Sequence, residues 1–256
     1  MFPNNPTPKP DYVDPPGPTL KPSLSPGRSI FGFLLLALLL PMNLFAQEEG
    51  GGIDTGDTSW ILVSTALVLF MNIPGLALFY AGLVRGKNVL SVLMHCFVLT
   101  ATMTVLWLVC GYSLAFSTTG MVEGTVNLKS FVGSLDLAML SGVDGSTTEG
   151  TIPKLLHFAF QMTFFIITPA LMVGAFVERM KFSSVLWFTA LWNLIVYAPI
   201  CHMVWGGGFL AEMGLLDFAG GVVVHVTAGV SALVLAIMLG RRRGFPNEIQ
   251  PPHSPG

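Results

Sequence analysis

The sequence predicts an all-α polytopic membrane protein, a bundle of five bilayer-spanning helices. Composition is the first indication: of 256 residues, 52% are hydrophobic and only 10% are charged, with a mean hydropathy of +0.70. Soluble domains carry roughly 25% charged residues. The second indication is a set of five apolar segments, each long enough for the roughly 20 residues that cross a bilayer. None of the five contains Asp, Glu, Lys or Arg.

Several functional classes are not supported by the residue pattern. A net charge of -2 does not provide the positive charge that is typical of nucleic-acid-binding proteins. Four histidines lie in or beside apolar segments, and no two are three or four residues apart, so no single helix face offers a metal site. There is also no nucleophile–base spacing. We therefore expect no cofactor, no metal and no enzymatic activity. The four histidines are His95, His157, His202 and His225.

Two segments precede the first long apolar stretch. Residues 1–29 are rich in proline, cannot bury a core, and are predicted to be disordered. Arg28 then precedes a Leu-rich run, Ile30–Phe45, which ends before the small residue Ala46. A positive start, an apolar middle and a small residue at the end predict a signal peptide over residues 30–46. The alternative is an uncleaved membrane helix.

The five apolar segments follow in order, within a domain predicted over residues 57–243. Prolines 74, 169 and 199 fall inside three of them and predict kinks. The tail, residues 244–256, is polar and Pro-rich. The predicted spans are Trp60–Val84, Val89–Phe116, Leu155–Val177, Phe182–Trp205 and Phe218–Leu239.

Orientation follows from the charges in the short loops. Cations follow the first, third and fifth spans, whereas acidic residues gather at the opposite ends. Cytoplasmic loops carry the excess of Lys and Arg, so the mature N-terminus is predicted to lie outside the inner (plasma) membrane. A cleaved signal peptide gives the same topology. The cations are Arg85, Lys87, Arg179, Lys181, Arg241, Arg242 and Arg243.

Two polar residues at the fifth span are candidates for function. His225 lies eight residues after Asp217, which we expect to place it near the middle of the helix. A neutral imidazole offers one donor and one acceptor to a small polar solute in a narrow pore. The alternative is a buried histidine bonded to a neighbouring carbonyl. For Asp217 the default interpretation is structural, a carboxylate that caps the helix N-terminus.

Aromatic residues at the outer ends of the third and fourth spans are candidates for binding a cation. Trp205 is followed at once by Gly206–Gly208, which allow close backbone approach. An indole face attracts a desolvated cation. Phe160 and Phe164, one helical turn apart, could add aromatic surface to the same place. The alternatives are an interfacial tryptophan and plain packing.

Taken together, the motifs resemble the Amt/Mep/Rh ammonium transporter family, and most closely its bacterial Amt branch. They appear in the family's order and spacing between Asp57 and about His253. The matching segments are PGLALFYAGLVRGKNVLS (Pro74–Ser91), FAFQ (Phe158–Gln161), GAFVERMKFSSVL (Gly174–Leu186), HMVWGGG (His202–Gly208), DFAGGVVVH (Asp217–His225) and GRRRGFP (Gly240–Pro246).

The resemblance implies a homotrimer of eleven-helix protomers, each with its own pore. The family's outer cation site falls on Phe160, Phe164 and Trp205, its structural aspartate at the pore mouth on Asp217, and its first pore histidine on His225. The chain corresponds to the first inverted repeat, and the last residues to a cytoplasmic loop toward a sixth helix. We therefore expect a fragment, a truncated product or one piece of a split protein.

The function expected from the resemblance is transmembrane transport of ammonium in the lipid bilayer. Ammonium binds at the outer aromatic site, loses its proton, and ammonia is conducted past the pore histidine. The alternative is a non-conducting membrane subunit or an ammonium sensor. The family also commonly contacts a PII-type regulatory protein from its cytoplasmic face.

Overall fold

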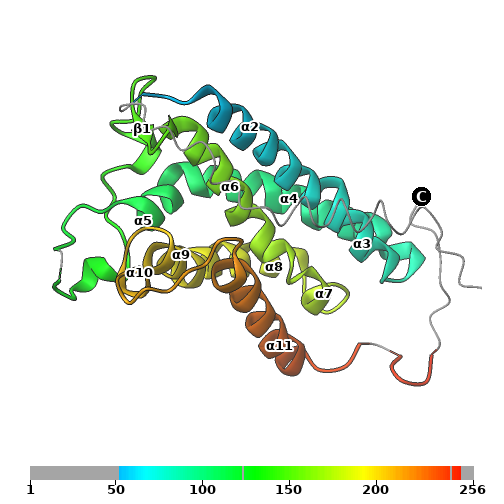
Figure 1. Cartoon of the computed structure of the whole chain (residues 1–256). Helices are drawn as coiled ribbons and strands as arrows, with labels where there is room; N and C mark the ends of the chain where they lie inside the picture. Colours follow the sequence, from blue (N-terminus) through cyan, green and yellow to red (C-terminus); the bar gives the residue numbers. More distant parts are fainter. Residues whose placement is uncertain (1–51, 123, 243, 249–256) are drawn as a thin grey trace, which may run out of the picture. The chain divides into compact units, whose positions relative to one another are not determined.

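The computed structural model describes residues 52–122, 124–242 and 244–248 (Figure 1). The predicted disordered extension (residues 1–29), the predicted signal peptide (residues 30–46) and the end of the predicted cytoplasmic loop lie outside the described residues. Within the described part, five helical segments are long and apolar enough to cross a membrane. This confirms the predicted five-span helical architecture.

Each span is assembled from shorter helical pieces. The first combines α2 (Thr55–Phe70), the π-helix η1 (Met71–Leu76) and α3 (Ala77–Gly82). The second combines η2 (Gly86–Asn88), α4 (Val89–Leu106), the π-helix η3 (Trp107–Gly111) and α5 (Tyr112–Phe116). The third is α6 (Lys154–Ala170) with α7 (Val173–Phe176). The fourth contains α8 (Phe182–Trp192), the π-helix η6 (Asn193–Tyr197), α9 (Ala198–Val204) and α10 (Phe209–Glu212). The fifth contains the π-helix η7 (Gly221–Val226) and α11 (Thr227–Leu239).

The long connection between the second and third spans carries the remaining elements. These are the short 3₁₀ helices η4 (Leu128–Ser130) and η5 (Ala138–Leu140), and an antiparallel pair of strands, β1 (Thr148–Glu149) and β2 (Ile152–Pro153). The strand turn is held to the start of α2, because the Asp54 N–H donates to the Thr151 carbonyl at 2.9 Å and the Thr151 hydroxyl donates to Asp57 at 2.6 Å. The strand pair therefore lies against the start of the first span.

The predicted kinks coincide with interruptions of the helices. At Pro74, the preceding Ile73 has non-helical dihedral angles (φ -128°, ψ 110°). The neighbouring Asn72 is buried, and its amide donates to the Thr100 hydroxyl of α4 at 2.7 Å. Pro169 lies next to the end of α6, and Pro199 occupies the first turn of α9. Proline removes a backbone donor, so each site is a natural break.

The third span is central to the bundle. In Figure 1, α6 crosses between the other helices, and 56% of its most apolar stretch is buried, compared with 11% for the first span. Its Phe165 is fully buried between Trp107, at 4.8 Å between ring centroids, and Tyr197, at 5.4 Å. Aromatic burial of this kind dominates packing energy. The second, third and fourth spans are joined through this cluster.

Two helix boundaries differ from those predicted. The first helix begins at Thr55 rather than Trp60, because the Asp54 side chain accepts from the Asp57 N–H at 2.7 Å and caps it. The fifth begins at Gly221 rather than Phe218, because Gly220 adopts a left-handed conformation (φ 78°) that ends the preceding turn. Short polar or glycine-containing caps decided both starts.

Candidate functional site: an aromatic chamber

A cavity of 260 Å³ lies where the second, third and fourth spans meet the segment before the fifth. Most of its lining residues are aromatic. The lining residues are Phe116, His157, Phe160, Gln161, Phe164, Trp205, Phe218 and Ala219. We call this cavity the aromatic chamber.

The three aromatic residues singled out from the sequence all line this chamber. Phe160 and Phe164 are one turn apart on α6, and their rings meet edge to face, with centroids 5.0 Å apart and planes at 88°. Phe164 in turn meets Trp205 at 5.7 Å and 66°. The three side chains thus form one continuous aromatic surface contributed by two different spans.

Trp205 is held in place by its indole nitrogen. The residue follows the last turn of α9, and its Nε1–H donates to the backbone carbonyl of Asp217 at 2.7 Å. Close backbone packing supports the same turn: a Cβ at Gly206 would overlap the carbonyl oxygen of Ala115. The ring plane is therefore set by the fold rather than left to rotate.

His202 fastens α9 to the long connection and is not a pore group. It is fully buried, its Nδ1 lies 3.0 Å from the Ala115 carbonyl, and its Nε2 lies 2.7 Å from the Lys129 carbonyl. Both ring nitrogens are engaged, so neither is available to a solute.

Asp217 caps the fifth span and does not line the chamber. Its carboxylate accepts backbone N–H bonds from Gly221 at 2.7 Å, from Val222 at 2.9 Å and from Val223 at 2.9 Å. Partial burial by itself would raise the pKa of Asp217. The backbone donors outweigh it and hold the pKa below its ordinary value. The residue is therefore charged at neutral pH.

His225 lies elsewhere than the sequence suggested. It belongs to η7, the first turn of the fifth span, and not to the middle of that helix. Its Nδ1 lies 2.9 Å from the Gly220 carbonyl. Because a carbonyl oxygen only accepts, Nδ1 carries the proton and Nε2 is left as an acceptor. Its side chain is exposed and is not part of the chamber wall.

Five chamber residues were not predicted from the sequence as part of a binding site: Phe116, His157, Gln161, Phe218 and Ala219. The most informative is Gln161, whose buried Oε1 has no hydrogen-bond partner among the described residues. His157 is engaged by the Tyr112 hydroxyl at 3.2 Å. Phe116 and Phe218 complete the wall. The available signal was a glutamine inside an otherwise apolar span, next to Phe160, since an amide in hydrocarbon is costly without a partner.

Fold and chamber together define a multi-span α-helical membrane protein with an aromatic chamber at one end of its bundle. Residues 59–256 match the model of the Ammonium Transporter Family. The chain is 43% identical over 222 residues to an ammonium transporter of Aquifex aeolicus, covering 85% of this chain and 50% of the relative. It is 47% identical over 190 residues to an ammonium transporter of Bacillus subtilis, covering 73% and 45%.

A solved structure agrees with these sequence matches. The crystal structure of Candida albicans Mep2 superposes with a TM-score of 0.65 at 35% identity, covering 74% of this chain and 40% of that one. The chain belongs to the Ammonium Transporter Family. It spans about half the length of the curated relatives that it matches.

Proposed function

We propose that this chain forms part of an ammonium transporter and that its aromatic chamber is the site where ammonium is first bound. The observation that carries the proposal is the continuous surface of Phe160, Phe164 and Trp205 around a small cavity. The relatives bearing the name ammonium transporter support the choice of substrate.

The chamber suits a small cation. Aromatic faces attract a desolvated cation by about 0.5–2 kcal/mol each, most strongly for tryptophan. The Gln161 amide can add a hydrogen bond, because no described residue holds its oxygen. The Asp217 carboxylate contributes negative potential beside the chamber without entering it, since its oxygens are turned to the backbone of η7.

Translocation requires the proton to leave. Carrying a bare cation through hydrocarbon is costly, so ammonium sheds its proton beyond the chamber and ammonia continues. The Nε2 of His225 is an acceptor when Nδ1 bonds the Gly220 carbonyl, so it can take a hydrogen bond from ammonia without holding a charge. The proton travels separately if net ammonium is moved.

The same family assignment supports a proposal for the assembly and the location. We propose a homotrimer of complete protomers in the inner (plasma) membrane, with the mature N-terminus outside and the loops bearing Arg85, Arg179 and Arg242 in the cytoplasm. That cytoplasmic face is the surface on which a PII-type regulator would act.

A chimera tests the function. Residues 57–243 of this chain replace the corresponding half of the Aquifex aeolicus relative, and the fusion is expressed in a host that lacks ammonium uptake. We expect saturable methylammonium uptake that His225→Leu reduces strongly. An inserted, stable chimera without uptake would contradict the proposal, and bound methylammonium without flux would favour an ammonium sensor.

The 256-residue chain alone provides a second test. Because His225 is exposed rather than enclosed by described residues, we expect the reconstituted chain to give no ammonia flux above that of empty liposomes. Saturable flux that His225→Leu blocks would show that the second half of the relatives is not needed.

A further inference from the structure

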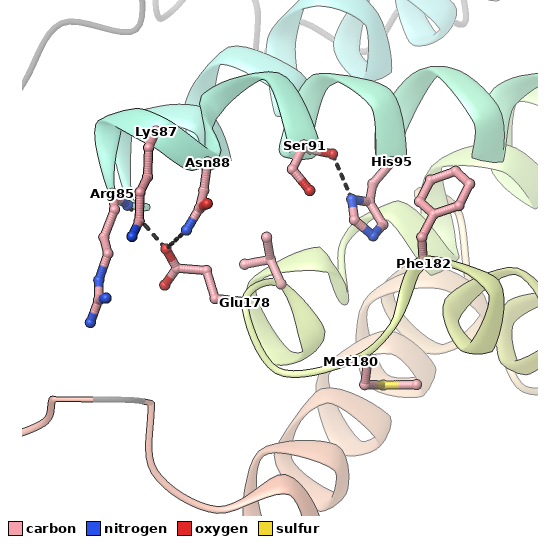
Figure 2. Close-up of a pocket in the computed structure, with 9 residues that line it drawn as sticks. Arg85, Lys87, Asn88, Ser91, His95, Glu178, Met180 and Phe182 are labelled. Carbon is pink, nitrogen blue, oxygen red and sulfur yellow. Dashed lines mark hydrogen bonds between the residues drawn. The ribbon is translucent and has the colours of Figure 1, made fainter.

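A second pocket lies at the opposite end of the second span from the aromatic chamber. It has a volume of 370 Å³ and is bounded by the start of α4 and by the loop between α7 and α8 (Figure 2). We call it the basic-end pocket. Its polar lining residues are Arg85, Lys87, Asn88, Ser91, His95 and Glu178.

The pocket carries charges of both signs. Glu178 Oε1 accepts from the backbone N–H of Arg85 at 3.2 Å and from the Asn88 amide at 2.5 Å. Both bonds use one oxygen, and no described residue bonds Oε2, so that oxygen can accept from a ligand. The Lys87 ammonium makes no hydrogen bond or ion pair within the part of the chain that the structure describes. A ligand with both a negative and a positive group would match this layout.

His95 is the independent indication that something binds here. The side chain is only 5% exposed, and its Nε2 is buried with no hydrogen-bond partner in the described part of the chain. Its Nδ1 lies 2.6 Å from the Ser91 carbonyl, so Nδ1 carries the proton and neutral Nε2 is an acceptor. A buried acceptor left without a partner destabilises the protein. A ligand that brings an N–H donor removes that destabilisation.

Glu178 is held in a conformation that side chains rarely adopt. Its φ of 64° lies in the left-handed region, which is strained for a non-glycine residue. That conformation accompanies a carboxylate that faces the start of α4 (Figure 2). Strain of this kind concentrates at ligand-binding sites.

A separate apolar groove lies between α4 and α8. It has a volume of 310 Å³ and is lined by Thr102 of α4 and by Ser183, Leu186, Trp187 and Ala190 of α8. Ser183 directly follows Phe182, which lines the basic-end pocket. Thr102 lies about two turns beyond His95 along α4, about 10 Å away. The apolar groove therefore lies farther along α4 than the basic-end pocket, on the side of that helix that faces α8.

We propose that the basic-end pocket and this groove together bind one phospholipid with an amine-bearing, zwitterionic headgroup, of the phosphatidylethanolamine type. The phosphate lies against Lys87 and Ser91, the ammonium donates to Glu178 Oε2 and His95 Nε2, and one acyl chain lies in the groove. A purely anionic headgroup meets the Glu178 carboxylate. A trimethylated headgroup has no N–H to donate. This proposal does not depend on ammonium transport.

Lipid binding to the detergent-solubilised chain, followed by native mass spectrometry, is the test. We expect one tightly held phosphatidylethanolamine, bound roughly tenfold more tightly than phosphatidylcholine or phosphatidylglycerol of matched acyl chains. Lys87→Ala should weaken phosphatidylethanolamine binding about tenfold, whereas Lys181→Ala, outside the pocket, should not. Glu178→Gln should reduce the preference for phosphatidylethanolamine over phosphatidylglycerol.

Further variants and a competitor test the contributions of the lipid headgroup and the acyl chain separately. Ala190→Trp fills the groove and should lower affinity for the whole lipid, whereas Leu191→Trp, on the exposed side of α8, should not. Inorganic phosphate should compete only weakly, because it lacks the amine and the acyl chain. Equal retention of the three lipids by the unmodified chain would overturn the proposal, as would equal losses in Lys87→Ala and Lys181→Ala. Neither Lys87→Ala nor Ala190→Trp removes a described hydrogen bond.

Discussion

Replacing Asp217 by alanine tests how the fifth span is held beside the aromatic chamber. The carboxylate accepts three backbone N–H bonds of 2.7–2.9 Å at the start of η7. Asp217→Ala leaves all three donors without this partner. Asp217→Asn keeps one side-chain acceptor oxygen and removes the charge.

The magnitude follows from the bonds that are lost. Removing a helix-capping side chain costs about 0.5–2 kcal/mol, and the helix dipole adds about 0.3–1 kcal/mol for a charge at this position. Because three donors lose their partner and the site is only partly exposed, we expect about 2–3 kcal/mol for Asp217→Ala. At about 2–4 °C per kcal/mol for a chain of this size, that lowers Tm by roughly 4–12 °C. Asp217→Asn should lose about half as much.

Thermal unfolding in detergent, followed by tryptophan fluorescence, measures this directly. The probe is local, since the Trp205 indole donates to the Asp217 carbonyl. Glu212→Ala is the matched control, an exposed acid of α10 whose carboxylate bonds no described residue. An Asp217→Ala protein that unfolds at the wild-type temperature would refute the capping argument.

The pH dependence has a definite sign. The folded pKa of Asp217 is lowered from its ordinary value of 3.8, so folding favours the charged form. Its stabilisation is fully present above pH 3.8 and is lost as pH falls through the lower, folded pKa. Asp217→Ala should therefore differ from the wild type at neutral pH, and the difference should shrink in strong acid.

Three further predictions concern binding and topology. In the chimera, Trp205→Leu should weaken apparent methylammonium affinity about 2- to 30-fold. The control Trp187→Leu, at the exposed face of α8, should leave the affinity unchanged. If Trp205→Leu does not change the half-saturation concentration, Trp205 is an interfacial anchor and not a binding residue. Gln161→Leu should weaken the methylammonium affinity about fivefold through one lost hydrogen bond, and Gln161→Glu should preserve it. Equal affinities in the unmodified chimera and both variants would show that the Gln161 side chain does not bind the cation. A cysteine at position 87 (Lys87→Cys) should react with a membrane-impermeant reagent only after the cytoplasmic face is opened, and labelling in intact cells would reverse the proposed orientation.

The spans were predictable because their signal is local. Twenty or more residues without a charge must lie in hydrocarbon or in a large core, so composition alone placed all five. The prolines also marked the interruptions at 74, 169 and 199, since proline lacks a backbone donor wherever it occurs. Helix starts were less predictable. At Asp54 and at Gly220 the observed helix start differs by several residues from the predicted one, because the cap geometry sets the start and hydropathy does not detect it.

The functional residues were likewise predictable only where their signal is local in the sequence. Phe160 and Phe164 were recognisable as neighbours because i and i+4 share a helix face, and Trp205 because glycines follow it. Their meeting in one chamber required packing between the third and fourth spans. Gln161 was overlooked because one polar residue in an apolar span does not reveal whether it has a partner, and His225 was misplaced because the DFAGG segment forms a cap rather than a turn of helix.

The sequence by itself determined that this chain enters a membrane, where it crosses, and which motifs it shares with ammonium transporters. Each of these depends on hydrophobicity or residue order along a continuous stretch. Only the tertiary structure decided that Trp205 is anchored through Asp217, that Gln161 lines the aromatic chamber, and that Lys87, His95 and Glu178 surround a second pocket. Those relations join residues from different spans, and the distance between two spans is set by the side chains packed between them, which no local pattern records.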